Sequence, residues 1–449
     1  MRLSSILTCM AGIGHKRSWR WRCPTLAALA LLLACSGGCG GQAEPAGVVS
    51  VWAHAGRAVE RNTLEQQVAE YNARSRTDRV KLTFIPEGSY NGQVQAAALA
   101  GDLPDVLEFD GPYLYTYVWQ GRLRPLDALL PETLRDGLLP SIIAQGTYRG
   151  HLYSVGTFDS GLGLWGDRRA LEQAGVRIPK GPADAWTSSE FDNVLAALAA
   201  RDPDGAVLDL KLNYPDEWFT YAFSPLIESA GGDLIDRNAY RTAEGVLNGP
   251  AAVRAMRRIQ GWFRSGYVDP NLDDAAFVQR RVALAWGGHW NYPRYHKALG
   301  NDLVLLPLPR FGPRMVTGEG SWSWGITRRC RRPEAAARFL RYLLQPDQVL
   351  AISEANGGVP ATRAAIARSP LYGPHSPLRL FAEQLREGYA VPRPRTPAYP
   401  TISAAFAQAF RAVRNGVAPK RALDRAVQMI DRDIRDNHGY PDVAVTGGR

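Results

Sequence analysis

Three short runs decide the fold of this chain: VVSVW at residues 48–52, VKLTFI at 80–85 and DVLEF at 105–109. Each is short and mainly apolar, and the second also alternates apolar with polar residues, as strands do. Leu64, Val68 and Tyr71 recur at spacings of four and three, which indicates a helix between the first two runs. Helices are expected over 61–74, 90–99 and 113–120. Strands that alternate with helices predict an α/β fold, with a parallel sheet covered by helices.

A second region of the chain repeats this alternation. Thr187 and Glu190 form a capping-box pattern directly before an apolar run, which predicts a helix start. Strands are expected over 162–165, 282–286 and 302–306. Helices are expected over 191–200, 250–266, 334–344, 404–413 and 420–430. The sequence therefore predicts a second α/β region built like the first.

Composition excludes several classes of protein. The chain has 449 residues, of which 45% are hydrophobic and 21% charged, and this excludes wholesale disorder. No apolar run reaches the roughly 20 residues of a membrane-spanning helix, which excludes a polytopic transporter or channel. The formal net charge is +10, and residues 1–34 carry five of the basic residues and no acid. The other basic residues are scattered rather than in blocks, so no nucleic-acid partner is expected.

The N-terminus is typical of an exported protein. Four basic residues between 16 and 22 precede the apolar stretch TLAALALLLA at 25–34, which predicts a signal peptide over 1–34. Met10 is an alternative initiator to Met1. Leu32-Leu33-Ala34-Cys35 resembles a bacterial lipobox, and this predicts that Cys35 is acylated and anchors the chain to a membrane. Residues 35–47 are then a lipidated, glycine-rich tether. An ordinary secretory signal, or acylation of Cys39, is the alternative.

Motifs of catalysis do not stand out. The chain lacks the nucleophile elbow, the zinc helix motif and the phosphate-binding loop. Its histidines have no metal-ligand spacing. Asp269, Asp273 and Asp274 lack the glycine and the final glutamate of a calcium loop and are interpreted as a solvated turn. We therefore expect no catalytic residue, no metal and no cofactor, although two carboxylates that meet in the fold would suit a secreted glycosidase.

An ordered set of segments resembles a known family from Val48 to the C-terminus. The segments are VWAH at 51–54, GDLPDV at 101–106, GRLRPL at 121–126, YAFSPLIESAGG at 221–232, FVQRRVALAWGGHW at 277–290, GEGSWSWGIT at 318–327, and the stretches 335–344 and 398–410. They resemble the extracellular solute-binding proteins of ABC importers, in the carbohydrate-binding family that includes the maltose-binding proteins. The resemblance implies a two-lobed periplasmic-binding-protein-like fold (type II) with the ligand in the interlobe cleft. Lobe 1 is expected over 48–156 plus 307–352, and lobe 2 over 157–306 plus 353–449.

The resemblance also implies a function and its partners. The protein would capture a mono- to oligosaccharide by lobe closure and deliver it to the transmembrane subunits of an ABC permease. It would act as a monomer, lipid-anchored at the outer face of the cytoplasmic membrane, in a periplasm or at a cell surface. The alternatives are a binding protein for glycerol phosphate or another non-sugar solute, and the glycosidase.

Polar candidates for ligand contact follow the expected strands, because open parallel sheets bind ligands beyond their carboxyl ends. His54 and Arg57 follow the first strand, Ser89 or Tyr90 follows the second and Asp110 follows the third. Ser89 is alternatively the start of a helix. Asp110 would accept two hydrogen bonds from adjacent sugar hydroxyls. Asp159 matches an acidic ligand residue of the maltose-binding proteins, with a hinge-stabilising hydrogen bond as the alternative.

Aromatic candidates come from the same resemblance, since sugars stack their apolar faces on aromatic rings. The candidates are Trp218, Tyr221, Trp290, Trp322 and Tyr399, together with Gly288 and Gly320, whose backbone a ligand can approach closely. Most other tryptophans are expected to be core, namely Trp165, Trp186 and Trp262. Arg393 is interpreted as a solvated surface arginine, with contact to an anionic ligand as the alternative.

Overall fold

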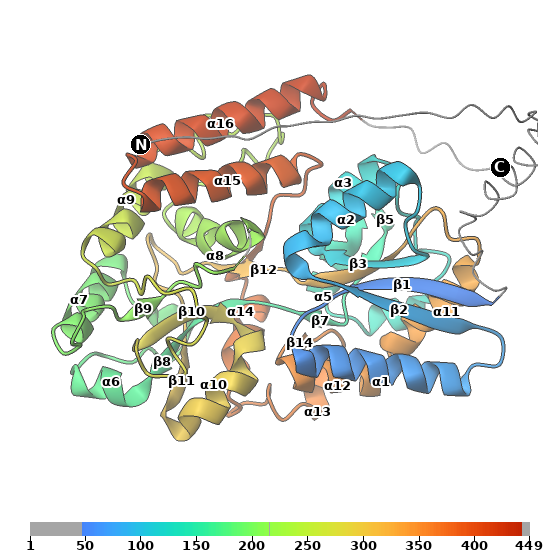
Figure 1. Ribbon diagram of the computed structural model, residues 1–449, viewed down its shortest axis with the longest axis horizontal. Helices are drawn as coiled ribbons and strands as arrows, with labels where there is room; N and C mark the ends of the chain where they lie inside the picture. Colours follow the sequence, from blue (N-terminus) through green and yellow to red (C-terminus); the bar gives the residue numbers. More distant parts are fainter. Residues whose placement is uncertain (1–46, 215, 442–449) are drawn as a thin grey trace, which may run out of the picture. The chain divides into compact units, whose positions relative to one another are not determined.

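The computed structural model describes residues 47–214 and 216–441, and the chain from Gly47 on forms one compact unit (Figure 1). The expected signal peptide and tether, with Cys35 and Cys39, lie outside the described residues. Within them, no helix is long and apolar enough to cross a membrane.

The first of two main sheets has five strands in the order β2-β1-β3-β13-β6. Their bounds are β1 Val48–His54, β2 Arg79–Ile85, β3 Val106–Asp110, β6 Ser154–Val155 and β13 Trp322–Ile326. Strand β1 pairs in parallel with β2 and with β3, as the sequence predicts. Strand β13 returns from far along the chain and pairs antiparallel with both β3 and β6.

Helices cover both faces of this sheet (Figure 1). On one side lie α2 (Glu87–Ala100) and α3 (Leu114–Trp119), and on the other lie α1 (Ala58–Arg74) and α12 (Pro346–Asn356). The predicted helix over 334–344 is α11 (Pro333–Leu343), which packs against α1 and β13. This first lobe is therefore a three-layered α/β unit.

The second main sheet has four strands in the order β11-β8-β10-β9. Their bounds are β8 Leu162–Asp167, β9 Leu208–Asp209, β10 Leu284–Gly288 and β11 Leu303–Leu306. Only β10 and β9 are parallel, whereas β8 pairs antiparallel with both β10 and β11. A sheet built like the first was thus a wrong expectation, because β8 enters from the first lobe and runs against its neighbours.

Helices also pack around the second sheet. They are α7 (Ser188–Ala199), α8 (Asp216–Ser229), α9 (Pro250–Arg264), α10 (Tyr292–Leu299), α15 (Tyr399–Arg414) and α16 (Pro419–Asp436). The predicted capping box opens α7, with Thr187 and Glu190 each accepting a hydrogen bond from the other's backbone N–H. Trp165, Trp186 and Trp262 are buried core residues, as expected.

Two short pairs of strands connect the lobes. Strand β7 (Phe158–Asp159) leads from β6 to β8 and pairs with β14 (Val359–Pro360). Strand β12 (Thr317–Glu319) leads from β11 to β13 and pairs with β15 (Ala390–Pro392). The expected lobe limits stay a prediction, and the limit at 352/353 falls inside α12.

Shorter elements complete the fold. They are α4 Glu132–Asp136, α5 Pro140–Gly146, β4 Thr147–Tyr148, β5 His151–Leu152, α6 Arg168–Gln173, α13 Arg363–Arg368 and α14 Arg379–Arg386, with 3₁₀ turns η1 Gly111–Tyr113, η2 Pro182–Asp184, η3 His289–Asn291 and η4 Gly300–Asp302.

Candidate functional site

A cleft of about 800 Å³ is lined by residues of both lobes. The first lobe contributes residues at the carboxyl ends of β1 and β3, and the second contributes residues that follow β10. This is the edge at which sequence reasoning placed the ligand. Of the predicted site residues, the cleft lining includes His54, Arg57, Asp110, Trp218, Tyr221, Trp290, Gly320 and Trp322.

Aromatic rings from both lobes form much of the cleft wall. Trp322, on β13, packs edge-on against Tyr90 of α2 with ring centroids 5.2 Å apart. In the second lobe the ring of Trp290 contacts those of Trp218 and Tyr221, with centroids 6.1 and 6.4 Å away. Trp290 and Trp322 are partly exposed, whereas Trp218 is buried and donates its indole N–H to the carbonyl of Leu210. The two partly exposed indoles therefore offer their surfaces to the cleft.

A glycine determines where Trp290 lies. A Cβ at Gly288 would come within 2.1 Å of the Trp290 ring, so no other residue fits there without a shift. Gly288 itself is buried, and its carbonyl accepts a hydrogen bond from Trp165. The expectation that Gly288 lines the cleft is thus wrong, because the Trp290 ring covers it. Gly320 does line the cleft, with a φ of +120° that favours glycine.

The polar centre of the cleft is a buried arginine. Both terminal nitrogens of Arg393 donate to the carboxylate of Asp110 at 2.7 Å, and one of them also donates to Glu217 at 2.6 Å. Burial would lower the pKa of Arg393, but the carboxylates of Asp110 and Glu217 and the neighbouring Tyr399 outweigh it and keep the arginine charged. Arg393 is only 6% exposed, which corrects its interpretation as a solvated surface residue. Asp110 lines the cleft, and Arg393 donates one hydrogen bond to each of its oxygens.

Tyr399 belongs to the same polar cluster as Arg393, through their shared partner Glu217. Its side chain is fully buried, and its hydroxyl donates to Glu217. Ser403 donates to the other oxygen of Glu217 at 2.5 Å. Burial raises the pKa of Glu217, and Arg393 counteracts that shift. Tyr399 does not line the cleft, so its predicted place is wrong: α15 turns the ring toward Tyr113 and the carboxylate instead.

Two predicted polar contacts also lie off the cleft. Asp159 is fully buried and accepts hydrogen bonds from the side-chain amide of Gln145 at 3.0 and 3.1 Å and from the backbone of Ser160 at 2.8 Å. Asp159 therefore lies where the alternative expectation put it, as a hydrogen-bonding residue in the segment that connects the lobes. Ser89 is exposed and donates to the carbonyl of Pro86 within the first turn of α2. The next residue, Tyr90, lines the cleft in its place.

Arg57 connects the two lobes across the cleft. One terminal nitrogen donates to the hydroxyl of Tyr214 at 2.9 Å and to Asn291 at 3.2 Å, and Asp274 lies 3.4 Å away. Asp274 also pairs with the fully buried Lys211 at 2.8 Å, which contradicts its interpretation as part of a solvated turn. These partners were missed because each is an isolated polar residue in a loop or at a helix start.

The described residues contain no group of three or more metal-ligating side chains suited to a metal ion.

A cleft between two α/β lobes, with aromatic walls and buried ion pairs, defines the class of two-lobed solute-binding proteins. A family model described as bacterial extracellular solute-binding protein matches residues 66–373. The chain belongs to this family.

Two curated relatives agree with the family at low identity. The maltodextrin-binding protein MdxE of Bacillus subtilis is 24% identical over 149 residues, which are 31% of this chain and 36% of the relative. An uncharacterized lipoprotein of Streptomyces antibioticus is 22% identical over 328 residues, 69% of each chain. For MdxE the match thus spans about a third of the relative's length.

Solved structures share the fold over most of the described chain. The GacH receptor of Streptomyces glaucescens, solved unliganded and with acarbose, has a TM-score of 0.75 at 21% identity. The match covers 88% of this chain and 100% of the receptor. The maltose/maltodextrin-binding domain MalE of Bdellovibrio bacteriovorus, bound to maltotriose, has a TM-score of 0.72 at 18% identity, with 87% and 100% covered. These matches confirm the predicted two-lobed α/β fold.

Proposed function

We propose that this chain is the substrate-binding lipoprotein of an ABC importer for carbohydrate. It captures a mono- to oligosaccharide in the cleft, the lobes close, and the closed form delivers the ligand to the transmembrane subunits of the permease. Closure needs ligand contacts with both lobes, because only a difference in affinity between the open and closed states shifts their equilibrium. The protein acts without cofactor or catalysis, as a monomer.

One observation carries the proposal: partly exposed indoles from different lobes, Trp322 and Trp290, line one cleft of about 800 Å³. Sugars stack apolar C–H faces on such rings, and a cleft of this volume suits a ligand the size of an oligosaccharide. The maltotriose in the Bdellovibrio structure and the acarbose in the Streptomyces structure give the same support by analogy.

The anionic alternative is less well supported. Glycerol phosphate would need positive charge that no carboxylate offsets, whereas the guanidinium groups of Arg57 and Arg393 already face Asp274 and face Asp110 and Glu217. A neutral saccharide keeps these pairs intact. The glycosidase alternative would use Asp110 and Glu217, but Arg393 lies between these carboxylates and donates to both.

The sequence of the N-terminus supports export and anchoring. Residues 1–34 are the proposed signal peptide, Cys35 the proposed lipidation site and 35–47 the proposed tether, outside the described residues. The folded part is then held at the outer face of the cytoplasmic membrane, next to its permease.

A thermal-shift screen tests the binding function. A chain that starts at residue 42 keeps the whole compact unit from Gly47 on. It is screened against mono-, di- and trisaccharides and against glycerol phosphate. A ligand at 100 times its dissociation constant stabilises the fold by about 2.7 kcal/mol, which moves the melting temperature measurably. A shift with an intact saccharide supports the proposal. A shift with glycerol phosphate alone favours the anionic alternative, and release of sugar products favours the glycosidase.

A further inference from the structure

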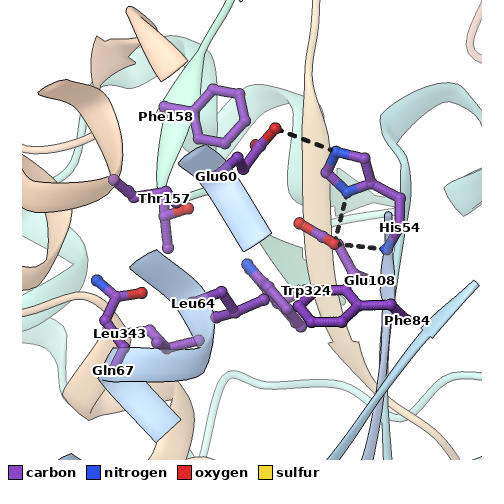
Figure 2. A pocket seen from close by; sticks show the side chains of 11 residues that line it. His54, Glu60, Leu64, Gln67, Phe84, Glu108, Thr157, Phe158, Trp324 and Leu343 are labelled. Atoms are coloured by element: carbon purple, nitrogen blue, oxygen red, sulfur yellow. Dashed lines mark hydrogen bonds and ion pairs between the residues drawn. The ribbon is translucent and has the colours of Figure 1, made fainter. Parts of the chain in front are cut away.

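A second, much smaller chamber of about 20 Å³ lies beside the cleft in the first lobe (Figure 2). His54, Glu60 and Phe158 line both the chamber and the cleft. Among the described residues that line the chamber, His54, Glu60 and Glu108 are ionisable.

His54 lies between the two carboxylates of this chamber (Figure 2). Its Nδ1 is 2.7 Å from Oε2 of Glu108, and its backbone N–H donates to the same oxygen at 3.0 Å. Its Nε2 is 3.7 Å from Oε2 of Glu60. A neutral imidazole carries a hydrogen on one ring nitrogen, whereas the imidazolium carries one on each. Because each nitrogen faces a carboxylate, the site is built for the charged ring.

The electrostatics of the site favour the same form. Burial alone would lower the pKa of His54, but Glu108 and Glu60 outweigh it and raise the pKa well above its ordinary value. Burial would raise the pKa of Glu60, but His54 and the amide of Asn356 lower it to about 2. Burial raises the pKa of Glu108, and His54 counteracts this shift. His289, which faces Glu60 from the second lobe, is neutral at pH 7, since burial lowers its pKa to about 4.

The indole of Trp322 stacks on the flat face of the His54 ring. The two ring centroids are 3.9 Å apart and the planes differ by 5°, which is a stacked pair. His54 is only 6% exposed, while Trp322 is partly exposed and lines the cleft. A cation that lies over the face of an indole is attracted by its π electrons. His54 therefore fixes the plane of Trp322 from the protein side.

We infer that His54 is a positioning residue of the ligand site: held between Glu108 and Glu60, it orients the Trp322 ring so that its other face stacks on the ligand. The inference rests on the proposed function, because it takes the ligand to be a saccharide. Sequence reasoning assigned His54 a direct hydrogen bond to the ligand, and the geometry replaces that contact with one made through Trp322.

A double-mutant cycle separates positioning from direct contact. The probe is the saccharide that gives the largest shift in the thermal screen, titrated by calorimetry into wild type, H54A, W322A and the double variant. We expect H54A to weaken binding about 2- to 12-fold in the wild-type background, since one aromatic pair contributes about 0.5–1.5 kcal/mol. In the W322A background it should cause no further loss. An equal loss in both backgrounds, or no loss in either, overturns the inference.

The pH profile adds a readout that does not depend on a folded H54A variant. Wild-type affinity should be constant at neutral pH and fall as the pH rises through the pKa of folded His54, because the charged ring is then lost. E60Q should move this fall to lower pH, and E65Q, an exposed change on the same helix α1, should not. A profile that E60Q leaves unchanged overturns the inference.

A ligand-free measurement keeps the two proposals distinguishable. The histidine ring ¹⁵N signals are followed by NMR during a pH titration of the free protein, with H54Q used to assign the His54 signals. A His54 that titrates near its usual value of about 6.5 overturns the inference even if saccharides bind. If no saccharide in the screen binds, the proposed function and a Trp322 that stacks on sugar both fail, whatever the titration shows.

Discussion

The guanidinium of Arg393 donates two parallel hydrogen bonds of 2.7 Å to the carboxylate of Asp110. Asp110 ends β3 in the first lobe, and Arg393 directly follows β15. Glu217, on α8 of the second lobe, accepts a third hydrogen bond from the same guanidinium at 2.6 Å. The single charge of this buried arginine thus bridges two carboxylates from different lobes that line the cleft.

Replacing this arginine should cost much of the fold's stability. Arg393→Gln leaves two partly buried carboxylates without their cation, and removing one partner of a buried ion pair costs about 3–5 kcal/mol. We expect a fall of that order in the free energy of unfolding, measured by urea denaturation at pH 7. Arg386→Gln is the control, because Arg386 is exposed and pairs with its exposed neighbour Glu387. That change should cost under about 1 kcal/mol. Similar losses for both variants would contradict the role of the buried pair.

Loss of the second-lobe indole should weaken ligand binding without unfolding the protein. Removing the contact of a large aromatic side chain costs about 1.5–3 kcal/mol, so Trp290→Ala should weaken saccharide binding roughly 10- to 100-fold. Calorimetry measures the affinity, and circular dichroism checks the fold. Trp119→Ala is the matched control, since Trp119 packs against Tyr440 and donates to the carbonyl of Pro441, outside the cleft lining. An unchanged affinity in Trp290→Ala would remove this residue from the site.

Part of the site could be predicted from the sequence because local rules place it. The ends of β1 and β3 are visible as short apolar runs, so the positions of His54 and Asp110 follow from the rule for parallel sheets. His54 and Asp110 line the cleft because chain direction determines which edge of the sheet they reach. Trp290, after Gly287-Gly288 at the end of β10, is placed instead by the family resemblance.

The remaining contacts depend on partners far away in the sequence. Arg393 looks solvated in a proline-rich segment, since its two acidic partners are 283 and 176 positions away. Tyr399 is near cleft-lining residues in the sequence, but the rotation of α15 about its axis turns the side chain inward. No local sequence pattern predicts that rotation. The stacking of His54 on Trp322 joins residues from β1 and β13, which pair through a third strand.

Acylation of Cys35 should determine where the protein is found. Cys35→Ser removes the thiol that the proposed lipid occupies, so the chain should move from the membrane fraction to the soluble fraction. Fractionation with immunoblotting of the full chain, expressed in a bacterial host, measures this. Cys39→Ser is the matched control, four residues along the same tether, and should stay with the membranes. Release by Cys39→Ser alone would instead assign the anchor to Cys39.

A carboxyl group in the connection between the lobes should make stability depend on pH. Glu319 lies on β12 and accepts a hydrogen bond at 3.2 Å from Gln145, whose amide also donates to the buried Asp159. Burial and the neighbouring Asp159 raise the pKa of Glu319 to about 8, although Arg395 and Gln145 counteract the shift. The folded state therefore keeps a proton that the unfolded chain releases near its usual value of about 4.3.

The sign of the effect follows from this difference in bound protons. Between about pH 4.3 and 8 the folded state binds more protons than the unfolded state, so the Glu319 contribution to stability falls as the pH rises. Glu319→Gln cannot lose that proton. It should match wild type near pH 4 and become more stable than wild type toward pH 8, by up to about 5 kcal/mol, because one pKa unit corresponds to about 1.4 kcal/mol. Urea unfolding from pH 4 to pH 9 measures the difference in stability between the two proteins. Taking this difference cancels the titration of other buried acids such as Glu228.

Glu132→Gln, an exposed change on α4, should follow the wild-type curve throughout. A Glu319→Gln curve that runs parallel to wild type would show that Glu319 is already ionised in the folded protein at neutral pH.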